Sequence, residues 1–164
     1  EDGGMYDEVA LRIEIAKVIA EIKPDVVIGP DHKLYPESHP DHLRVGEAVS
    51  KAYFMCSNVN MMKSVGATQI AKPTVLAYYF TGKPNRFVKI TKKDFEKTKA
   101  AYACFVSQCP PPDNGKSLML YMRLKVRLNG LRSFHIRADA FRVMNNMHIH
   151  CCGEAEDTAI RRPL

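Results

Sequence analysis

Apolar residues recur at helical spacing over residues 5–22, where two stripes merge into one wide face. The stripes consist of Val9, Ile13, Ala16 and Ala20, and of Leu11, Ile15, Val18 and Ile22. Lys23-Pro24 ends this pattern, and residues 25–28 form a short, continuous run rich in β-branched side chains. Such a run is typical of a strand that is buried on both faces of a parallel sheet. The beginning of the chain therefore predicts a helix followed by a buried strand.

Helical and strand patterns continue to alternate after this strand. Pro40 is preorganised for the first position of a second helix, whose apolar positions continue to Cys56. Thr91 and Asp94 resemble a capping box at the start of another helix. The other expected segments are an irregular stretch at 57–73, strands at 74–80 and 86–90, a loop at 107–116, a helix at 117–128 that ends near Asn129-Gly130, and a strand at 134–143. This alternation predicts the α/β class, as a Rossmann-like three-layer sandwich with a mostly parallel sheet.

Length and composition fit one globular domain. We expect this domain at residues 1–143 and a C-terminal tail at residues 144–164. With 164 residues, of which 46% are apolar and 26% charged, the chain can bury a core. An odd number of cysteines, five, argues against a disulfide framework and favours a reducing, cytoplasmic setting. No apolar run reaches the roughly 18 residues of a membrane span, so we expect no membrane partner.

The net charge of +6 is concentrated in residues 116–142, where Asp139 is the single acidic residue. The basic residues of this segment are Lys116, Arg123, Lys125, Arg127, Arg132, Arg137 and Arg142. A solvated helix face explains such a run, and an anionic substrate, an acidic partner or nucleic acid are the functional alternatives. No aromatic-rich base-stacking motif accompanies the charges, so we expect no nucleic-acid partner.

Two imidazoles and a carboxylate fall within one helical turn at His39-Pro40-Asp41-His42. His39 and His42 are three residues apart, so a helix would place them on one face. One imidazole could bind a metal while the other transfers a proton, and Asp41 could orient a ring. The preceding strand leads to the carboxyl edge of a parallel sheet, where such sheets bind ligands. The spacing leaves a second interpretation open, because histidine pairs arise by chance and a catalytic zinc normally has three protein ligands.

The strand at residues 24–30 and the stretch from His39 to Ala48 together resemble the PIG-L/LmbE family of zinc-dependent N-acetylglucosamine deacetylases. Further segments that resemble this family are Asp2-Gly3-Gly4, Tyr78-Tyr79-Phe80, Phe87 to Thr91, Lys99 to Ser107-Gln108, and Ala138-Asp139-Ala140-Phe141-Arg142. The resemblance spans about residues 1–143. It is closest to the branch that deacetylates N-acetylglucosaminyl-malate on the way to bacillithiol.

The resemblance implies a role for each residue of the motif. His42 matches the zinc ligand, His39 the unligated histidine that stabilises the oxyanion or protonates the amine, and Asp41 its partner. Asp2 matches a sugar-contacting acid, and Gln108 ends a helix from which it could reach the sugar. The implied reaction is hydrolysis of the acetamide by a zinc-activated water, with a carboxylate as general base.

The same resemblance implies the substrate, the metal, the oligomeric state and the location of the protein. The substrate would be a small amino-sugar conjugate, for which the basic residues would suit an anionic aglycone such as malate. One zinc ion, or another divalent metal, would bind each subunit of a cytoplasmic homo-oligomer.

The family's second motif, A-H-P-D-D-E, has no counterpart in these 164 residues. It supplies two further zinc ligands and the general base, and the N-terminal β-α-β portion of the fold that carries it is also missing. One histidine cannot hold a catalytic zinc. Either upstream sequence provides these parts, or the chain is a non-catalytic binding or interaction module that keeps the fold. His148-Ile-His150-Cys151-Cys152 could bind a soft metal, but its spacing fits no standard site and favours a simple tail.

Overall fold

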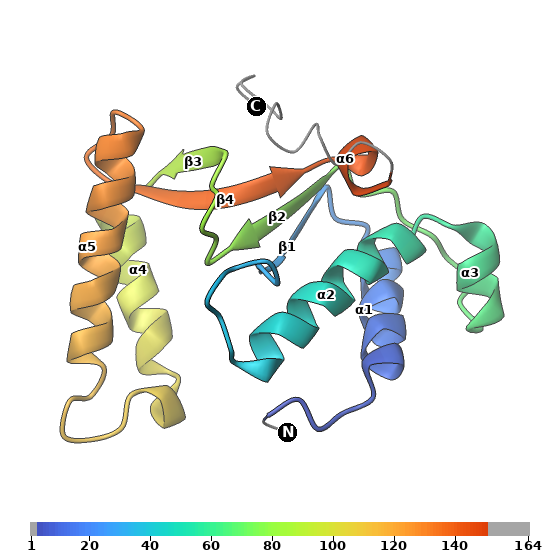
Figure 1. Cartoon of the computed structure of the whole chain (residues 1–164), viewed down its shortest axis with the longest axis horizontal. Coiled ribbons are helices and arrows are strands. Elements are labelled where there is room, and N and C mark those ends of the chain that lie inside the picture. Colours follow the sequence, from blue (N-terminus) through green and yellow to red (C-terminus); the bar gives the residue numbers. More distant parts are fainter. Residues whose placement is uncertain (1–2, 151–164) are drawn as a thin grey trace. The chain divides into compact units, whose positions relative to one another are not determined.

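The computed structural model describes residues 3–150, which contain parts of two compact units. The first unit comprises Glu1–Arg86 and the chain from Phe141 onward, and the second comprises Phe87–Ala140. The elements of the first unit, labelled in Figure 1, are α1 (Glu8–Ile22), β1 (Val26–Pro30), α2 (Pro40–Met55), α3 (Val59–Ser64), β2 (Val75–Tyr79) and α6 (Asn146–His150). The second unit contains α4 (Lys92–Ala103), the short 3-10 helix η1 (Val106–Gln108) and α5 (Lys116–Arg132). Strands β3 (Arg86–Lys89) and β4 (Ala138–Met144) cross the boundary between the units.

The four strands form a mixed sheet in the order β1-β2-β4-β3. Strands β1 and β2 are parallel, with Val26 opposite Val75 and Pro30 opposite Tyr79. Strand β4 is antiparallel to β2, with Leu76 opposite Met144. The α/β class is therefore confirmed, whereas the expected mostly parallel arrangement holds for the β1–β2 pair and not for β4.

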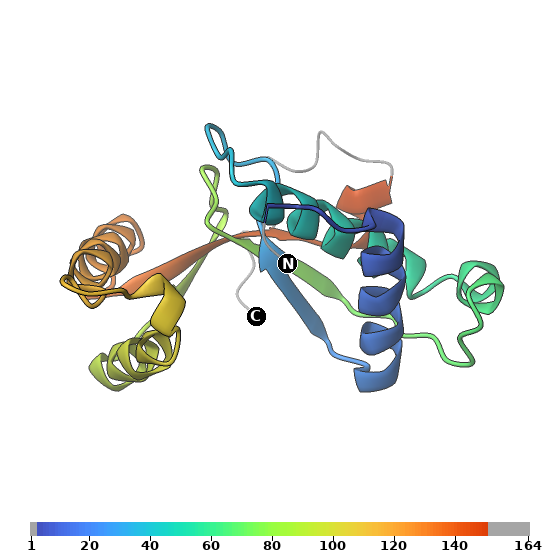
Figure 2. The same ribbon diagram turned by 90° about the horizontal axis from the view of Figure 1, so that it is seen from below.

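Helices α1 and α2 lie side by side in both views and share a core with β1 and β2 (Figures 1 and 2). Buried members of this core include Ala16, Ile19, Val27, Ala52, Tyr53, Leu76 and Tyr78. On β1, Val27 joins the core, while Val26 and Ile28 point to the opposite face and are 43% and 57% exposed. The prediction that this strand is buried on both faces is wrong for these two residues. This face of β1 is therefore partly exposed.

Local sequence signals account for the helix boundaries. Helix α1 begins after Asp7, whose side chain accepts hydrogen bonds from the backbone N–H groups of Val9 and Ala10. Helix α2 has Pro40 in its first turn, as predicted. The capping box of Thr91 and Asp94 is also present at the start of α4.

Two segments differ from the predictions, and each has its own cause. Helix α3 forms within the stretch expected to be irregular, where Asn58 caps it and Met62 is buried. Helix α5 continues through Asn129-Gly130 to Arg132 instead of ending there. A Cβ on Gly130 would lie 2.6 Å from the carbonyl oxygen of His135, so glycine here permits a close backbone approach.

Gly46 has a similar role between α2 and the end of β1. A Cβ at this position would overlap the carbonyl oxygen of Pro30 and lie 3.0 Å from the Cβ of His32. We therefore expect Gly46→Ala to lower the free energy of unfolding by about 1–3 kcal/mol through overpacking. The gain of up to about 1 kcal/mol in helix propensity is smaller than this cost.

Urea unfolding followed by circular dichroism measures this effect. Gly82→Ala is the matched control, since its added Cβ would meet Leu34 at an ordinary 3.5 Å. Equal or higher stability of Gly46→Ala relative to the unsubstituted protein would contradict the close approach.

Candidate active site

The carboxyl ends of β1 and β2 lie at the same edge of the sheet because the two strands are parallel. The pairing extends one step beyond β1, where the backbone N–H of Asp31 donates to the carbonyl oxygen of Tyr79 at 3.0 Å. Phe80 follows β2 directly, and its ring centroid lies 6.4 Å from that of His42. The loop after β1, the turn after β2 and the start of α2 therefore meet at this edge.

His39 and His42 lie together at the start of α2, as the spacing predicts. Their rings are stacked with centroids 4.6 Å apart and planes inclined by 23°. His39 occupies the N-cap position, but its side chain makes no capping hydrogen bond. Its imidazole is thus not committed to stabilising the helix end.

Glu37 holds the ring of His42 from the preceding loop. Its Oε2 lies 2.8 Å from His42 Nδ1, and its Oε1 accepts hydrogen bonds from the backbone N–H groups of Ser38 and His39 at 2.9 and 2.8 Å. The contact with His42, followed by the bond from the His39 N–H, lowers the pKa of Glu37 to about 2. The sequence patterns did not single out Glu37, although a carboxylate in the loop five positions before a candidate ligand was a usable signal.

The carboxylate of Asp41 fixes the backbone that precedes α1. It accepts hydrogen bonds from the N–H groups of Gly4 at 2.7 Å and Gly3 at 3.1 Å. Burial alone would raise the pKa of Asp41, but these bonds outweigh it and lower the pKa below its usual range. Arg44 adds to the attachment by donating to the carbonyl oxygen of Gly4 and pairing with Glu8 at 3.2 Å. Asp41 therefore links two segments, and its predicted contact with an imidazole stays a prediction.

The proposed roles of the other predicted site residues stay predictions. Asp2 lies outside the described residues. Gln108 ends η1 in the second unit, and its side chain is not among those described. In the tail, His148 Nδ1 accepts a hydrogen bond from the N–H of Asn145 at 3.2 Å, while Cys151 and Cys152 lie outside the described residues.

A buried ion pair lies at the same sheet edge. Arg142 of β4 donates from Nε to Asp31 Oδ2 at 2.9 Å and from Nη2 to Asp31 Oδ1 at 2.6 Å. Both side chains are 3% exposed, and the guanidinium lies 4.5 Å from the centroid of the Tyr78 ring. The interpretation of residues 116–142 as a solvated helix face is thus wrong for Arg142.

Residues 3–150 contain no group of three histidine, cysteine, aspartate or glutamate side chains that could hold a metal ion. The carboxylate of Glu37 on the His42 ring is an arrangement common for metal-bound histidines, but a catalytic zinc needs about three protein ligands. The described residues therefore do not fit a complete zinc site. No helix among them combines the length and the apolar character needed to cross a membrane.

Known proteins resemble this chain in both sequence and structure. The family model described as PIG-L: GlcNAc-PI de-N-acetylase matches residues 1–53, the segment that carries Glu37, His39, Asp41 and His42. Diacetylchitobiose deacetylase of Thermococcus kodakarensis is 32% identical over 146 residues, which cover 87% of this chain and 53% of that protein. These matches relate the chain to the PIG-L/LmbE deacetylases.

Solved structures agree with this relationship to the PIG-L/LmbE deacetylases. N,N'-diacetylchitobiose deacetylase from Pyrococcus horikoshii, complexed with its inhibitor MPG, has a TM-score of 0.76 and 27% identity. The match covers 89% of this chain and 55% of that one. A conserved protein of Thermus thermophilus shares the fold, with a TM-score of 0.65 at 22% identity over 85% of this chain and 60% of its own. The chain spans about half the length of the deacetylases it matches.

Proposed function

We propose that this chain is part of a zinc-dependent hydrolase that removes the acetyl group from an N-acetylglucosamine conjugate, giving a free amine and acetate. The observation that supports this most is the pair of stacked imidazoles, one of them held by Glu37, within the matched segment 1–53. The names of the related deacetylases agree with an acetylated amino sugar as the substrate.

Each residue of the turn has a distinct task in this proposal. Glu37 engages Nδ1 of His42, which leaves Nε2 as the nitrogen for a metal. His39 hydrogen-bonds the acetamide oxygen as negative charge develops there and delivers a proton to the departing amine. Asp41 anchors Gly3-Gly4 against the turn and so fixes the frame that carries both histidines.

The remaining metal ligands and the general base would come from residues outside this sequence. Zinc, or another divalent ion, would supply Lewis-acid chemistry at the acetamide. A GlcNAc-malate-like conjugate of the bacillithiol branch is the specific substrate we propose. A homo-oligomeric assembly and a cytoplasmic location stay predictions.

A non-catalytic binding module is the second candidate. It is favoured by the lack of a three-ligand group within residues 3–150. Such a module would bind an amino sugar without holding zinc or releasing acetate.

Zinc content and acetate release in the full-length protein separate the two candidates. We expect about one zinc per chain, as in other catalytic zinc sites. His42→Ala should lose both zinc and turnover. His135→Ala, which removes an exposed imidazole in the second unit, is the matched control and should retain both. Full-length protein that is free of zinc and inactive after reconstitution would overturn the deacetylase proposal and support the binding module.

A further inference from the structure

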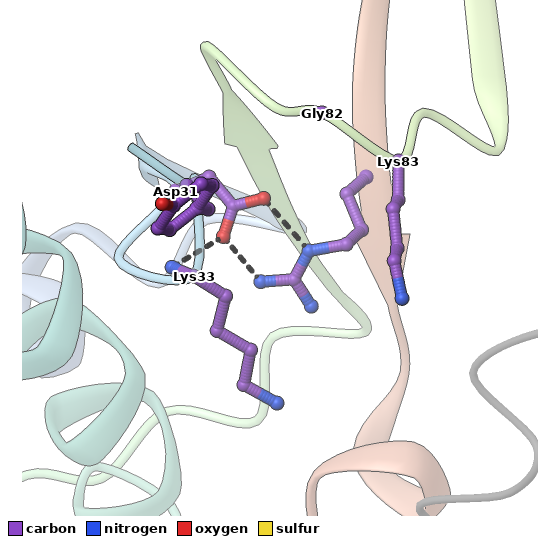
Figure 3. A pocket seen from close by; sticks show the side chains of 6 residues that line it. Asp31, Lys33, Gly82 and Lys83 are labelled. Atoms are coloured by element: carbon purple, nitrogen blue, oxygen red, sulfur yellow. Dashed lines mark hydrogen bonds and ion pairs between the residues drawn. The ribbon is translucent and has the colours of Figure 1, made fainter. Parts of the chain in front are cut away.

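A cavity of about 430 Å³ in the first unit lies away from the candidate active site. The space beside Asp31 and Lys33, seen in Figure 3, belongs to the sheet edge that carries the stacked imidazoles. The second cavity is instead bordered by α1, the later part of α2, α3 and α6. Its first lining residue on α2 is Ser50, which follows His42 by roughly 12 Å along the helix axis. Its volume is within the range of small-molecule sites, about 300–1,000 Å³.

Apolar side chains from three helices form much of the wall of this cavity. They are Phe54 of α2, Met61 of α3 and Ile149 of α6. The ring of Phe54 also lies against that of His150, with centroids 5.4 Å apart and planes inclined by 50°. A ligand with an aromatic or branched aliphatic body would therefore bury its apolar surface against these side chains.

Arg12 of α1 brings a guanidinium to this apolar lining. Its Nε is buried and has no hydrogen-bond partner among the described residues. Buried polar groups almost always have a partner, so this nitrogen indicates an acceptor that the described residues do not supply. Lys51 also lines the cavity, but its Nζ pairs with Oε1 of Glu47 at 2.6 Å. None of the described lining residues is acidic, so an incoming anion would meet no carboxylate in the lining.

We propose that this cavity binds a small carboxylate with an apolar body, at a site independent of the proposed deacetylase reaction. The Nε and one terminal nitrogen of a guanidinium can donate to the two oxygens of one carboxylate. A carboxylate carries a single charge, which Arg12 balances. A phosphate carries up to about two charges at pH 7, and apolar walls would make the desolvation of the second charge costly.

Calorimetry with three small probes tests the ligand class in the full-length protein. Hydrocinnamate has both the carboxylate and an apolar body, hydrocinnamide keeps the body without the charge, and inorganic phosphate lacks the body. We expect hydrocinnamate to bind at least about 10-fold more tightly than either of the others, because hydrogen bonds to charged groups are the stronger ones. Equal affinity for the carboxylate and its amide, tighter binding of phosphate, or no binding of hydrocinnamate would overturn the proposal.

Variants of the lining then locate the binding site. Arg12→Met removes the guanidinium and should weaken hydrocinnamate binding about 10-fold or more, with hydrocinnamide binding unchanged. Phe54→Ala should weaken the binding of both ligands, because it removes part of the apolar wall. Lys17→Met is the matched control, since it removes a positive charge from the same helix at a residue outside the cavity lining. Equal weakening by Arg12→Met and Lys17→Met would contradict a specific contact with Arg12.

The methyl group of Met61 provides a local readout that needs no change at Arg12. In protein with isotope-labelled methionine methyl groups, hydrocinnamate should shift the NMR signal of Met61, which Met61→Leu identifies. The signal of Met5, which is 82% exposed and does not line the cavity, should stay unchanged. Binding at the candidate active site would leave the Met61 signal in place, and that result would overturn the assignment to this cavity.

Discussion

Replacing His39 with alanine should lower kcat for acetate release by roughly 10²–10⁴-fold, the usual contribution of a positioned acid or base. The fold should survive this change, because the imidazole makes no capping hydrogen bond at the start of α2. Zinc content should also survive, since Glu37 engages the neighbouring His42 independently of the His39 ring. Steady-state kinetics, metal analysis and thermal unfolding together distinguish the loss of a proton donor from the loss of the metal site or of the fold.

The comparison variants for His39 are His42→Ala and His135→Ala. The first should lose zinc together with turnover, and the second should lose neither. Turnover of His39→Ala within a few-fold of the unsubstituted protein would refute the role of His39 as the acid. Loss of zinc from His39→Ala would instead reassign it as a metal ligand.

Asp31→Asn should lower the free energy of unfolding by about 3–5 kcal/mol, because it leaves a buried guanidinium without its counter-charge. The Arg142 side chain is 3% exposed, so water cannot replace the lost carboxylate. Urea unfolding at neutral pH measures the loss. Glu47→Gln is the control, since the Lys51–Glu47 pair is half exposed and should contribute about 1 kcal/mol or less.

A double-variant cycle and the pH dependence test the cause of this loss. The double variant Asp31→Asn/Arg142→Met removes both charges, so its free energy of unfolding should exceed that of Asp31→Asn. If it does not, the loss in Asp31→Asn comes from packing and not from the unpaired charge. Burial opposes ionisation of Asp31, but the bonds from Arg142, Thr81 and the Lys33 N–H lower its pKa overall. A carboxyl whose folded pKa is lowered stabilises the fold above its unfolded pKa of about 3.9, and this contribution disappears as the pH falls through the folded pKa. The difference between Asp31→Asn and the unsubstituted protein should therefore shrink below about pH 4.

The elements with strong local signals were predictable from the sequence. Pro40 and the Thr91–Asp94 box carry their structural meaning in their own side chains, so α2 and α4 begin where the pattern predicts. Asn129-Gly130 carries the local signal of a helix end, yet its backbone lies against residues 135–137 and the helix continues. The direction of β4 was likewise inaccessible, because strand pairing depends on partners distant in sequence.

The candidate site likewise contains contacts that the sequence predicts and contacts that it does not. His39 and His42 share a face because of helical spacing, which the sequence states directly. The pairing of Asp31 with Arg142 joins residues 111 positions apart, and no periodicity reports such a contact. Glu37 lies between these cases, since it is close in sequence but reaches His42 through a loop whose path the sequence does not determine.

Strand β1 stands first in the sheet order, so within residues 3–150 one of its edges has no neighbouring strand. The exposed side chains of Val26 and Ile28 lie along this strand. Unprotected strand edges with apolar side chains are templates for intermolecular pairing. We therefore expect this chain to self-associate as its concentration rises. Light scattering across a dilution series would then show a mean mass that increases with concentration, whereas an ordered assembly of fixed stoichiometry would keep a constant mass.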